Sequence, residues 1–273
     1  MKWMIDRSGG GRFVVLRASG TNAYSPYIYR DLGGVHSCET LILQTRGAGY
    51  DCFAVNQITC AEALFIAGGD QWDYVRLWQG TAIEDAIHTA AARGVPVGGT
   101  SAGLAILGEF AFSSEHGTVT SSQALGDPFH PHLTLSHDFL HLPFLGGVVA
   151  DSHFVARDRM GRLVTFLARM LAGGLAPRAR AIGVDEKTAL AVDDKGVGTL
   201  FGEGAVYFLE ALETPEVCRR GAPLTFRDVS VVRISGAGAQ FDLASWMGED
   251  GSTYQLSAVE GVLRSTQVGG SVY

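Results

Sequence analysis

The hydrophobic pattern of the chain alternates between two kinds of segment. Short apolar, β-branched runs are separated by stretches in which apolar and polar positions recur at helical spacing. This alternation is typical of parallel strands covered by helices, because a strand buried on both faces reads as a continuous apolar run. We therefore expect an α/β fold with a doubly wound, mostly parallel sheet and an antiparallel extension near the C-terminus. The predicted strands are residues 13–19, 39–45, 63–69, 95–99, 146–152, 180–186, 188–194, 197–202 and 205–210.

Helical periodicity marks three further segments. We predict helices over residues 74–93, over residues 157–171 and in the turns after Ser101. The second segment carries an apolar stripe at the spacing of a core-facing helix, formed by Leu163, Phe166, Leu167, Met170 and Leu171. No Pro/Ser linker or internal repeat divides the sequence. We therefore expect one domain over residues 1–273, with residues 224–273 as a β-rich appendage.

Composition narrows the class of protein. A chain of 273 residues that is 47% hydrophobic can bury a full-sized core. Its net charge of -7, without a basic stripe, argues against a nucleic-acid partner. No apolar run reaches the roughly 18 residues that cross a bilayer, and residues 1–10 lack the apolar centre of a signal peptide. We expect a cytoplasmic protein without a membrane partner, or an exported one if the sequence lacks its true N-terminus.

The cysteines form no metal-binding or redox pair motif. Cys38, Cys52, Cys60 and Cys218 include no CxxC spacing. We interpret them as buried free thiols. The alternative is one surface disulfide among the first three in an exported protein.

The stretch VPVGGTSAGLAIL, residues 95–107, places Ser101 between Gly99 and Gly103 where a predicted strand turns into a helix. This G-x-S-x-G pattern fits a nucleophile elbow, in which the serine occupies a strained turn and small residues on either side avoid collisions. The Ala102 N–H at the start of the helix could then stabilise an oxyanion. The alternatives are a glycine-rich turn that binds a phosphate and a plain tight turn.

A nucleophilic serine needs a base, and His153 is the strongest candidate. It closes the apolar run VVADSHF at the carboxyl end of a predicted strand, where open α/β sheets hold their ligands. The alternative is a hydrogen-bonded core histidine. Asp185 and Glu186 end another predicted strand, and only one of them can face His153, because side chains alternate along a strand. We select Glu186, although the residues alone hardly distinguish it from its neighbour.

The other histidines are weaker candidates for a functional site. His130, His132, His137 and His141 cluster in FHPHLTLSHDFLH and could ligate zinc, the last two at i, i+4 spacing. Pro131 breaks any helix there and no cysteine is near, so we interpret the segment as a surface loop and predict no metal. The isolated residues are expected in solvent; these are His36, His88 and His116.

A second glycine turn follows the predicted strand in FIAGGDQW, residues 65–72. Backbone N–H groups of Gly69 or Asp70 could complete an oxyanion hole opposite Ala102. The alternative is a simple strand-to-helix turn. Gln71 comes directly afterwards and could hydrogen-bond a substrate main chain.

Together these segments resemble the cyanophycinase and aspartyl dipeptidase family of serine peptidases. The matching stretches are VVLRASGTNAY, GGDQ, GTSAG, DSHFVARDRMGRL and IGVDEKTAL, which span residues 14–190. The resemblance implies a class I glutamine amidotransferase-like α/β fold, a homodimer and no cofactor. It also implies Ser101 as nucleophile, His153 as general base and Glu186 as the acid.

The resemblance also implies that arginines of HFVARDRMGRL reach the substrate, which points to Arg157, Arg159 and Arg162. Aspartyl substrates present carboxylates, and guanidinium groups bind carboxylates bidentately. The alternative is that some of these arginines pair with Asp158 or Glu186.

The expected activity is hydrolysis of aspartyl or isoaspartyl bonds in a peptide or dipeptide that carries aspartyl carboxylates. Ser152 stands where cyanophycinases usually have glutamine, which argues against cleavage of cyanophycin itself. Three alternatives remain: an amidase or glutaminase on the same fold, a metal-dependent hydrolase that uses the histidine cluster, and a catalytically inactive binding protein.

Overall fold

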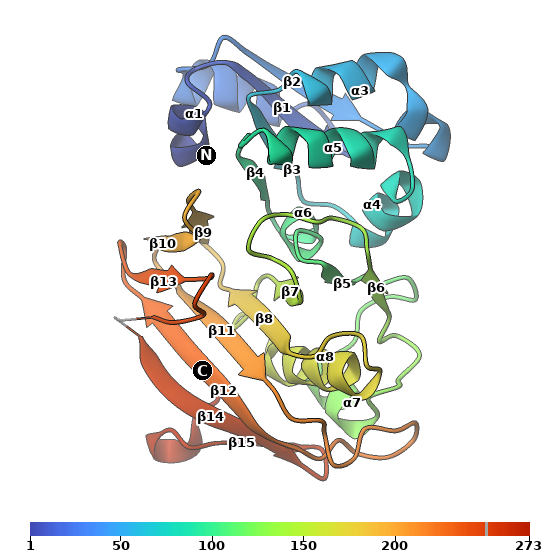
Figure 1. Ribbon diagram of the computed structural model, residues 1–273, viewed down its shortest axis with the longest axis vertical. Coiled ribbons are helices and arrows are strands. Elements are labelled where there is room, and N and C mark those ends of the chain that lie inside the picture. Colours follow the sequence, from blue (N-terminus) through green and yellow to red (C-terminus); the bar gives the residue numbers. More distant parts are fainter. Residues whose placement is uncertain (249–250) are drawn as a thin grey trace. The chain divides into compact units, whose positions relative to one another are not determined.

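The computed structural model describes residues 1–248 and 251–273, which divide into two compact units (Figure 1). Unit 1 comprises Met1–Glu109 and Ser136–Pro143, and unit 2 comprises Phe110–Leu135 and Phe144–Tyr273. Each unit is therefore assembled from two separate stretches of chain. The expectation of a single domain stays a prediction, and residues 249 and 250 of the predicted C-terminal appendage lie outside the described residues.

A four-stranded parallel sheet forms the centre of unit 1, in the order β2-β1-β3-β4. All four strands overlap predicted ones, and they are β1 (Arg12–Arg17), β2 (Ser37–Ile42), β3 (Ala63–Ile66) and β4 (Val97–Gly99). Because the strands are parallel, their carboxyl ends share one edge of the sheet. The connections that follow β3 and β4 therefore start side by side.

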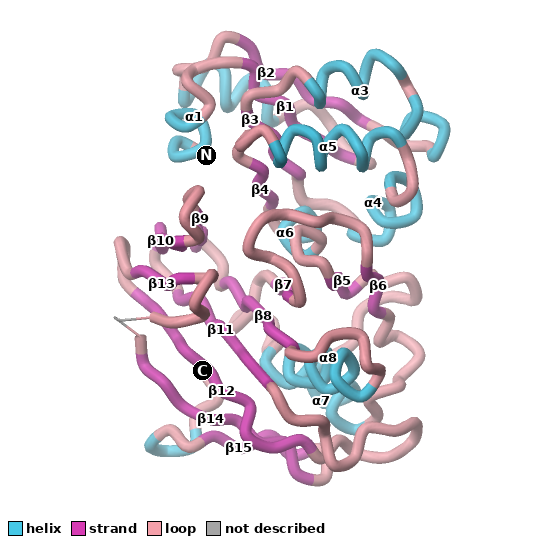
Figure 2. The backbone as a smooth tube through the Cα atoms, viewed as in Figure 1, coloured by secondary structure: helices cyan, strands magenta, loops and turns pink. Residues whose placement is uncertain are grey.

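Helical segments surround this sheet (Figure 2). They are α1 (Lys2–Arg7), α2 (Tyr24–Pro26), the π-helix η1 (Tyr27–Leu32), the 3-10 helix η2 (Arg46–Tyr50), α3 (Cys52–Thr59), α4 (Gln71–Trp78), α5 (Ala82–Ala92) and α6 (Ala102–Ala105). On one face of the sheet, Ile5 of α1 and Ile28 of η1 pack with Phe13 of β1. Val14 and Leu64 alternate to the other face and are equally buried, so both faces of the sheet are covered.

The predicted helix over residues 74–93 is wrong, because the chain breaks there into α4 and α5. Gly80 adopts φ +69°, a left-handed conformation that ends a helix. The Thr81 hydroxyl donates to the Trp78 carbonyl at 2.6 Å, and the Gly80 N–H donates to the Glu84 carboxylate. These local bonds replace the helical ones that an unbroken helix would need.

Unit 2 contains the first seven strands of an eight-stranded sheet with the order β15-β14-β12-β11-β8-β7-β5-β6, and a three-stranded sheet with the order β13-β10-β9. Strands β5, β7 and β8 pair in parallel, whereas β8, β11, β12, β14 and β15 pair antiparallel. The predicted α/β class, with parallel strands followed by antiparallel ones, is confirmed. Strands β12, β14 and β15 show that the β-rich C-terminal region belongs to the larger sheet.

The bounds of these strands and of the helices in unit 2 follow in chain order; of β6, only Leu135 belongs to unit 2. They are β5 (Phe110–Phe112), α7 (Ser121–Gly126), β6 (Leu135–His137), β7 (Val148–Asp151), α8 (Met160–Ala172), β8 (Ala179–Val184), β9 (Thr188–Val192), β10 (Val197–Gly202), β11 (Ala205–Ala211), β12 (Phe226–Ser235), β13 (Gln240–Asp242), β14 (Ser252–Val259), β15 (Val262–Ser265) and the 3-10 helix η3 (Val268–Gly270).

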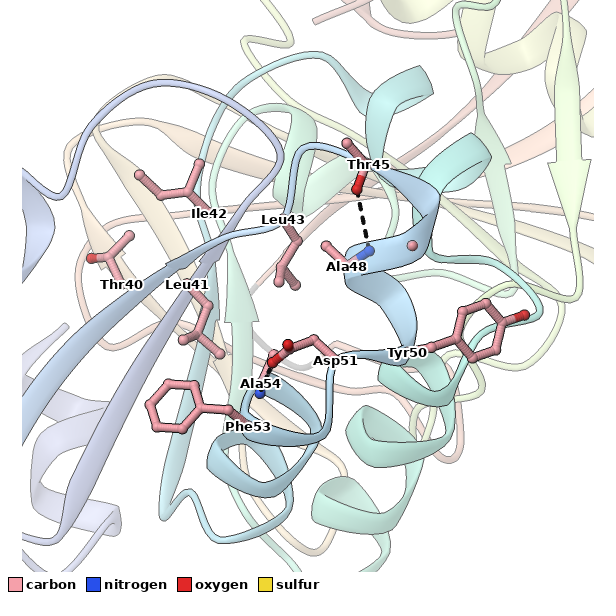
Figure 3. A pocket seen from close by; sticks show the side chains of 11 residues that line it. Thr40, Leu41, Ile42, Leu43, Thr45, Ala48, Tyr50, Asp51, Phe53 and Ala54 are labelled. Atoms are coloured by element: carbon pink, nitrogen blue, oxygen red, sulfur yellow. Dashed lines mark hydrogen bonds between the residues drawn. The ribbon is translucent and has the colours of Figure 1, made fainter.

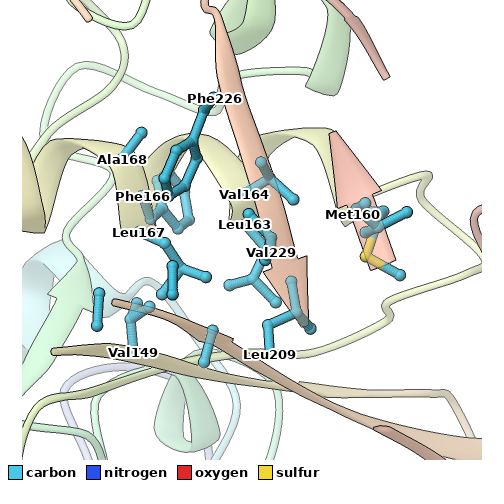
Figure 4. Packing of buried hydrophobic residues seen from close by; sticks show 14 of the residues in the cluster. Val149, Met160, Leu163, Val164, Phe166, Leu167, Ala168, Leu209, Phe226 and Val229 are labelled. Carbon is cyan, nitrogen blue, oxygen red and sulfur yellow. The ribbon is translucent and has the colours of Figure 1, made fainter. Parts of the chain in front are cut away.

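Helix α8 supplies much of the core of unit 2 (Figure 4). The whole predicted apolar stripe is buried, and Leu163, Phe166 and Leu167 have no exposed surface. Burial of each such side chain contributes about 1.5–3 kcal/mol. The helix begins at Met160, three residues later than predicted, because Asp158 adopts φ +46° and forms part of a preceding turn.

Two expectations from composition can be compared with the structure. None of the described helices has the length and apolarity that a bilayer crossing requires. All four cysteines are free thiols, but Cys52 and Cys60 are exposed, so the prediction of burial is wrong for these two. Cys38 and Cys218 are half-buried, and burial raises the pKa of each thiol to about 11.

Candidate active site

Ser101 occupies the strained turn that the sequence predicts. It lies between β4 and α6 and has φ 52° and ψ -116°. A non-glycine residue with positive φ is uncommon, and such strain persists only where the surroundings hold it. The predicted backbone strain at this serine is therefore confirmed.

The flanking glycines have no room for side chains. A Cβ at Gly99 would lie 2.3 Å from the Gly103 carbonyl oxygen, and a Cβ at Gly103 would lie 2.1 Å from the Ile66 carbonyl oxygen. Both separations are far below van der Waals contact. The small residues predicted on either side of the serine are required because α6 packs directly against the end of β3.

The turn after β3 lies beside Ser101, within unit 1. The Thr100 N–H donates to the Ile66 carbonyl at 3.1 Å, and a Cβ at Gly68 would lie 3.4 Å from the Ser101 Cβ. Gly69 and Asp70 follow in this turn and are exposed. The two predicted sources of oxyanion donors, this turn and the start of α6 at Ala102, are thus parts of one local structure. Sequence reasoning missed Gly68, because no spacing rule shows which glycine approaches the serine.

Asp70 also has a structural role. Its side-chain Oδ1 accepts a hydrogen bond from the Trp72 N–H at 2.9 Å and so caps α4. Capping by aspartate is favourable at a helix start, typically by about 1 kcal/mol. Gln71 is the first residue of α4 and is half-exposed.

His153 and Glu186 form a hydrogen-bonded pair in unit 2. His153 follows β7 and Glu186 follows β8, which pair in parallel, so both residues leave the same edge of the sheet. The His153 Nδ1 lies 2.7 Å from the Glu186 Oε1. The His153 side chain is 23% exposed, which leaves the ring accessible. A carboxylate in this place orients an imidazole and stabilises the imidazolium that forms when the ring accepts a proton.

Asp185, the other candidate acid, binds backbone instead. Its Oδ1 accepts from the Val155 N–H at 3.1 Å, and its Oδ2 accepts from the Ala205 N–H at 3.0 Å. These bonds tie the segment after His153 to the end of β8 and the start of β11. Of the two neighbouring carboxylates, Glu186 is therefore the one that contacts His153.

The three candidate arginines differ in their surroundings. The buried Asp151 carboxylate receives Arg162 Nε at 2.7 Å, Arg162 Nη2 at 2.6 Å and Arg159 Nη1 at 2.9 Å. The Arg162 side chain is only 3% exposed. We correct the expectation for Arg162, which has a structural role, because its guanidinium is enclosed with Asp151. Arg157 is exposed, and Arg159 is largely buried, with a 13% exposed side chain and a pKa lowered by burial.

Asp151 is a partner that sequence reasoning missed. The expected partners of the arginines were Asp158 and Glu186, whereas two of the arginines pair with Asp151. The available signal was a carboxylate that closes the buried run GGVVAD just before an arginine-rich segment. A charge at that position requires a partner, because burial of an unpaired carboxylate is strongly unfavourable.

The histidine cluster of the sequence is divided between the units. His130 and His132 belong to unit 2, whereas His137 and His141 belong to unit 1. Among the described residues, no group of three or more potential ligands could hold a metal ion. His88, expected in solvent, is half-buried, and its Nε2 accepts from the His141 N–H at 3.0 Å.

A cavity of about 550 Å³ lies beside the edge strand β2 in unit 1 (Figure 3). Side chains of β2, η2 and α3 line it, including Leu41, Tyr50 and Phe53. None of the predicted site residues belongs to this lining.

Comparisons with known proteins agree with the resemblance seen in the sequence. The chain is 26% identical to a cyanophycinase of Synechococcus elongatus over 184 residues, which cover 67% of this chain and 52% of that protein. It is 26% identical to a cyanophycinase of Geminocystis herdmanii over 178 residues, covering 65% and 60% of the two chains. The matched region thus spans about half the length of the first relative.

The fold is similar to that in a crystal structure of a peptidase from an acI-B1 Actinobacterium. The TM-score is 0.58 at 15% identity, over 88% of both chains, and this likeness concerns the fold alone. The model of peptidase family S51 matches residues 18–200, which is more than half of the chain. The chain belongs to peptidase family S51.

Proposed function

We propose that this protein is a serine peptidase that hydrolyses aspartyl or isoaspartyl bonds through an acyl-enzyme. Ser101 is the nucleophile, His153 the general base and Glu186 the acid that orients it. The observation that carries the proposal is the strained elbow of Ser101, enclosed by two obligatory glycines, in a chain of a peptidase family.

In the proposed reaction, His153 Nε2 takes the proton of Ser101 as Oγ attacks the scissile carbonyl. N–H groups of Gly69 or Asp70 and of Ala102 hold the oxyanion of the tetrahedral intermediate. His153 then gives the proton to the leaving amine. A water molecule, activated by the same ring, hydrolyses the ester and restores the serine.

The proposed substrate carries carboxylates next to the scissile bond. Arg157 is exposed, and its guanidinium can bind such a carboxylate bidentately. Arg159 can bind it only with the N–H groups that do not donate to Asp151. Gln71 hydrogen-bonds the substrate main chain. The proposed assembly is a homodimer, on the family resemblance.

The experiment that tests this function compares Ser101→Ala with the parent on a panel of α- and β-aspartyl dipeptides, small amides and cyanophycin. Loss of the nucleophile in a serine peptidase lowers kcat by about a million-fold, so the variant should be inactive. Ser114→Ala is the matched control, because Ser114 also has positive φ, at 58°. It should keep full activity.

A fluorophosphonate reagent provides the second measurement. It should label the parent at Ser101, located by mass spectrometry of the peptides, and leave Ser101→Ala unlabelled. Turnover of small amides alone would instead identify an amidase. Near-parental hydrolysis by Ser101→Ala would contradict the proposal, and an unlabelled, inactive parent would identify a binding protein.

A further inference from the structure

The chain segment after His153 is tightly turned and strained. His153 has φ 48° and Asp158 has φ 46°, both in the left-handed region. Such a conformation costs about 1–3 kcal/mol for each non-glycine residue and persists only where other contacts impose it. The Arg157 N–H donates to the His153 carbonyl, and the Arg159 N–H to the Phe154 carbonyl, each at 3.0 Å. The position of His153 therefore depends on contacts between this segment and residues elsewhere in the chain.

The hydroxyl of Tyr273 joins two points of this segment. It donates to Asp158 Oδ1 at 2.8 Å and accepts from the Met160 N–H at 3.0 Å. Met160 is the first residue of α8, and the residue before it, Arg159, makes no side-chain cap bond. Tyr273 thus satisfies a helix-start N–H that would otherwise lack a cap. Burial raises the pKa of Tyr273, so the phenol stays protonated and can donate to Asp158.

The ring of Tyr273 holds the other side of the same segment. Its centroid lies 5.9 Å from the rings of Phe154 and Tyr207, in edge-to-face geometry with both. Phe154 directly follows His153 and has no exposed surface. The Phe154 ring also covers Gly183 of β8, where a Cβ would lie 2.7 Å away. Phe154 is therefore fixed between β8, the strand that leads to Glu186, and the ring of Tyr273.

Tyr273 is itself held in place. The Tyr254 hydroxyl on β14 donates to the Val272 carbonyl at 3.0 Å, and Gln267 Nε2 donates to the Ser271 carbonyl at 2.9 Å. The segment that carries Tyr273 is thus anchored to the antiparallel strands. Through Tyr273, the turn after His153 is thus connected to these strands.

We propose that Tyr273 is a positioning residue for the general base, holding His153 in register with Glu186 through Phe154 and Asp158. This inference rests on the proposed role of His153. Tyr273 acts through the segment that follows His153, because its ring packs against Phe154 and its hydroxyl bonds to Asp158 and Met160. Residue 273 lies outside the region matched by the family model, which ends at residue 200.

The kinetic test uses Tyr273→Phe, which keeps the ring and removes the hydroxyl. Because small misplacements of catalytic groups slow a reaction strongly, kcat should fall about ten- to a hundredfold, with KM within about twofold. Tyr50→Phe is the matched control, since it removes a hydroxyl that donates to the Gly80 carbonyl at 2.9 Å in unit 1. Its kcat should equal that of the parent. Thermal melts establish that both variants are folded at the assay temperature.

Proton NMR gives a readout that does not depend on activity. The His153 Nδ1–H bound to Glu186 should give a downfield resonance, assigned by its disappearance in Glu186→Gln. Tyr273→Phe should shift or broaden this resonance, and Tyr50→Phe should leave it unchanged. Parental kcat together with an unchanged resonance in Tyr273→Phe would overturn the inference, and so would a lower melting temperature with parental kcat. Activity in Ser101→Ala would contradict the proposed function and leave the NMR result valid.

Discussion

Gly103 has no space for even one methyl group. Its Cβ position is 2.1 Å from the Ile66 carbonyl oxygen and 2.8 Å from the Ala67 carbonyl oxygen, and both oxygens are backbone atoms that cannot rotate away. Gly103→Ala should therefore push α6 off β3, with a loss of unfolding free energy of about 1–3 kcal/mol, as overpacked sites show. Urea denaturation measures this loss. In parallel, hydrolysis should drop at least tenfold, because Ser101 and Ala102 move with the helix.

Gly126→Ala is the control for this substitution. A Cβ there meets nothing within 4 Å, and Gly126 lies in helix α7, where alanine is favoured over glycine. This variant should be as stable as the parent or slightly more so. Equal stability and activity in Gly103→Ala would show that the close approach of α6 to β3 is not rigid.

The sequence alone predicted the role of some residues better than that of others. The strained turn of Ser101 was predictable, because only glycines permit the packing around such a serine and both glycines stand in the sequence. The choice between Asp185 and Glu186 was open, since strand alternation puts either one toward His153. The hydrogen bonds of Asp185 to Val155 and Ala205 decide the point, and partners so distant in sequence leave no local signal.

At the scale of elements, Asp151 joins the end of β7 to the start of α8. Replacement of Arg162 by methionine keeps the apolar stem and removes the guanidinium, which leaves the Asp151 carboxylate buried without its bidentate partner. Loss of one partner of a buried ion pair costs about 3–5 kcal/mol. Urea denaturation should show Arg162→Met destabilised by that amount.

Arg264→Met serves as the comparison, because Arg264 is an exposed residue of β15. Its unfolding free energy should match that of the parent within about 0.5 kcal/mol. If Arg162→Met were equally stable and raised KM alone, Arg162 would bind substrate, as the family resemblance implied.

Helix α5 is joined to the segment Ser136–Pro143 through His88. Burial and His141 lower the pKa of His88 below its ordinary value of 6.5, and Asp85 opposes them. A lowered pKa means that the unfolded chain takes up this proton first as the pH falls. The His88 contribution to stability is therefore complete above about pH 6.5 and decreases as the pH falls below it.

His88→Gln should flatten this dependence. The slope of unfolding free energy between about pH 5 and pH 7, followed by tryptophan fluorescence in urea, should be smaller than in the parent. His116→Gln, at an exposed position of unit 2, should keep the parental slope. Identical slopes in the two variants would show that His88 titrates alike in the folded and unfolded chain.

Every predicted strand was found, but several observed strands were not predicted. All nine predicted strands correspond to observed strands, because each is an apolar run bounded by turn residues. Strands β5 and β6 have three residues each, too few to show alternation, and neither was predicted. Strands β12, β13, β14 and β15 were expected only as a β-rich region, without individual bounds. The break at Gly80 was missed because the apolar pattern continues through it, and the interruption depends on the positive φ of Gly80 and on the local bonds of Thr81 and Glu84.

At the scale of the whole molecule, each unit has its own apolar core. One cluster gathers around α1 and β1 in unit 1, and a larger one gathers around α8 in unit 2. The sequence does not indicate this division, because no flexible linker separates the units. The chain crosses from one unit to the other in short loops and in strand β6. The fold class was predictable from periodicity, whereas the partition into cores depends on contacts between distant residues.

The segment Ser136–Pro143 has a consequence for biosynthesis. It belongs to unit 1, although 26 residues of unit 2, Phe110–Leu135, precede it in the chain. When the first 109 residues have left the ribosome, unit 1 therefore still lacks one of its two stretches of chain. The native structure of unit 1 can therefore be complete only after residue 143 has emerged from the exit tunnel.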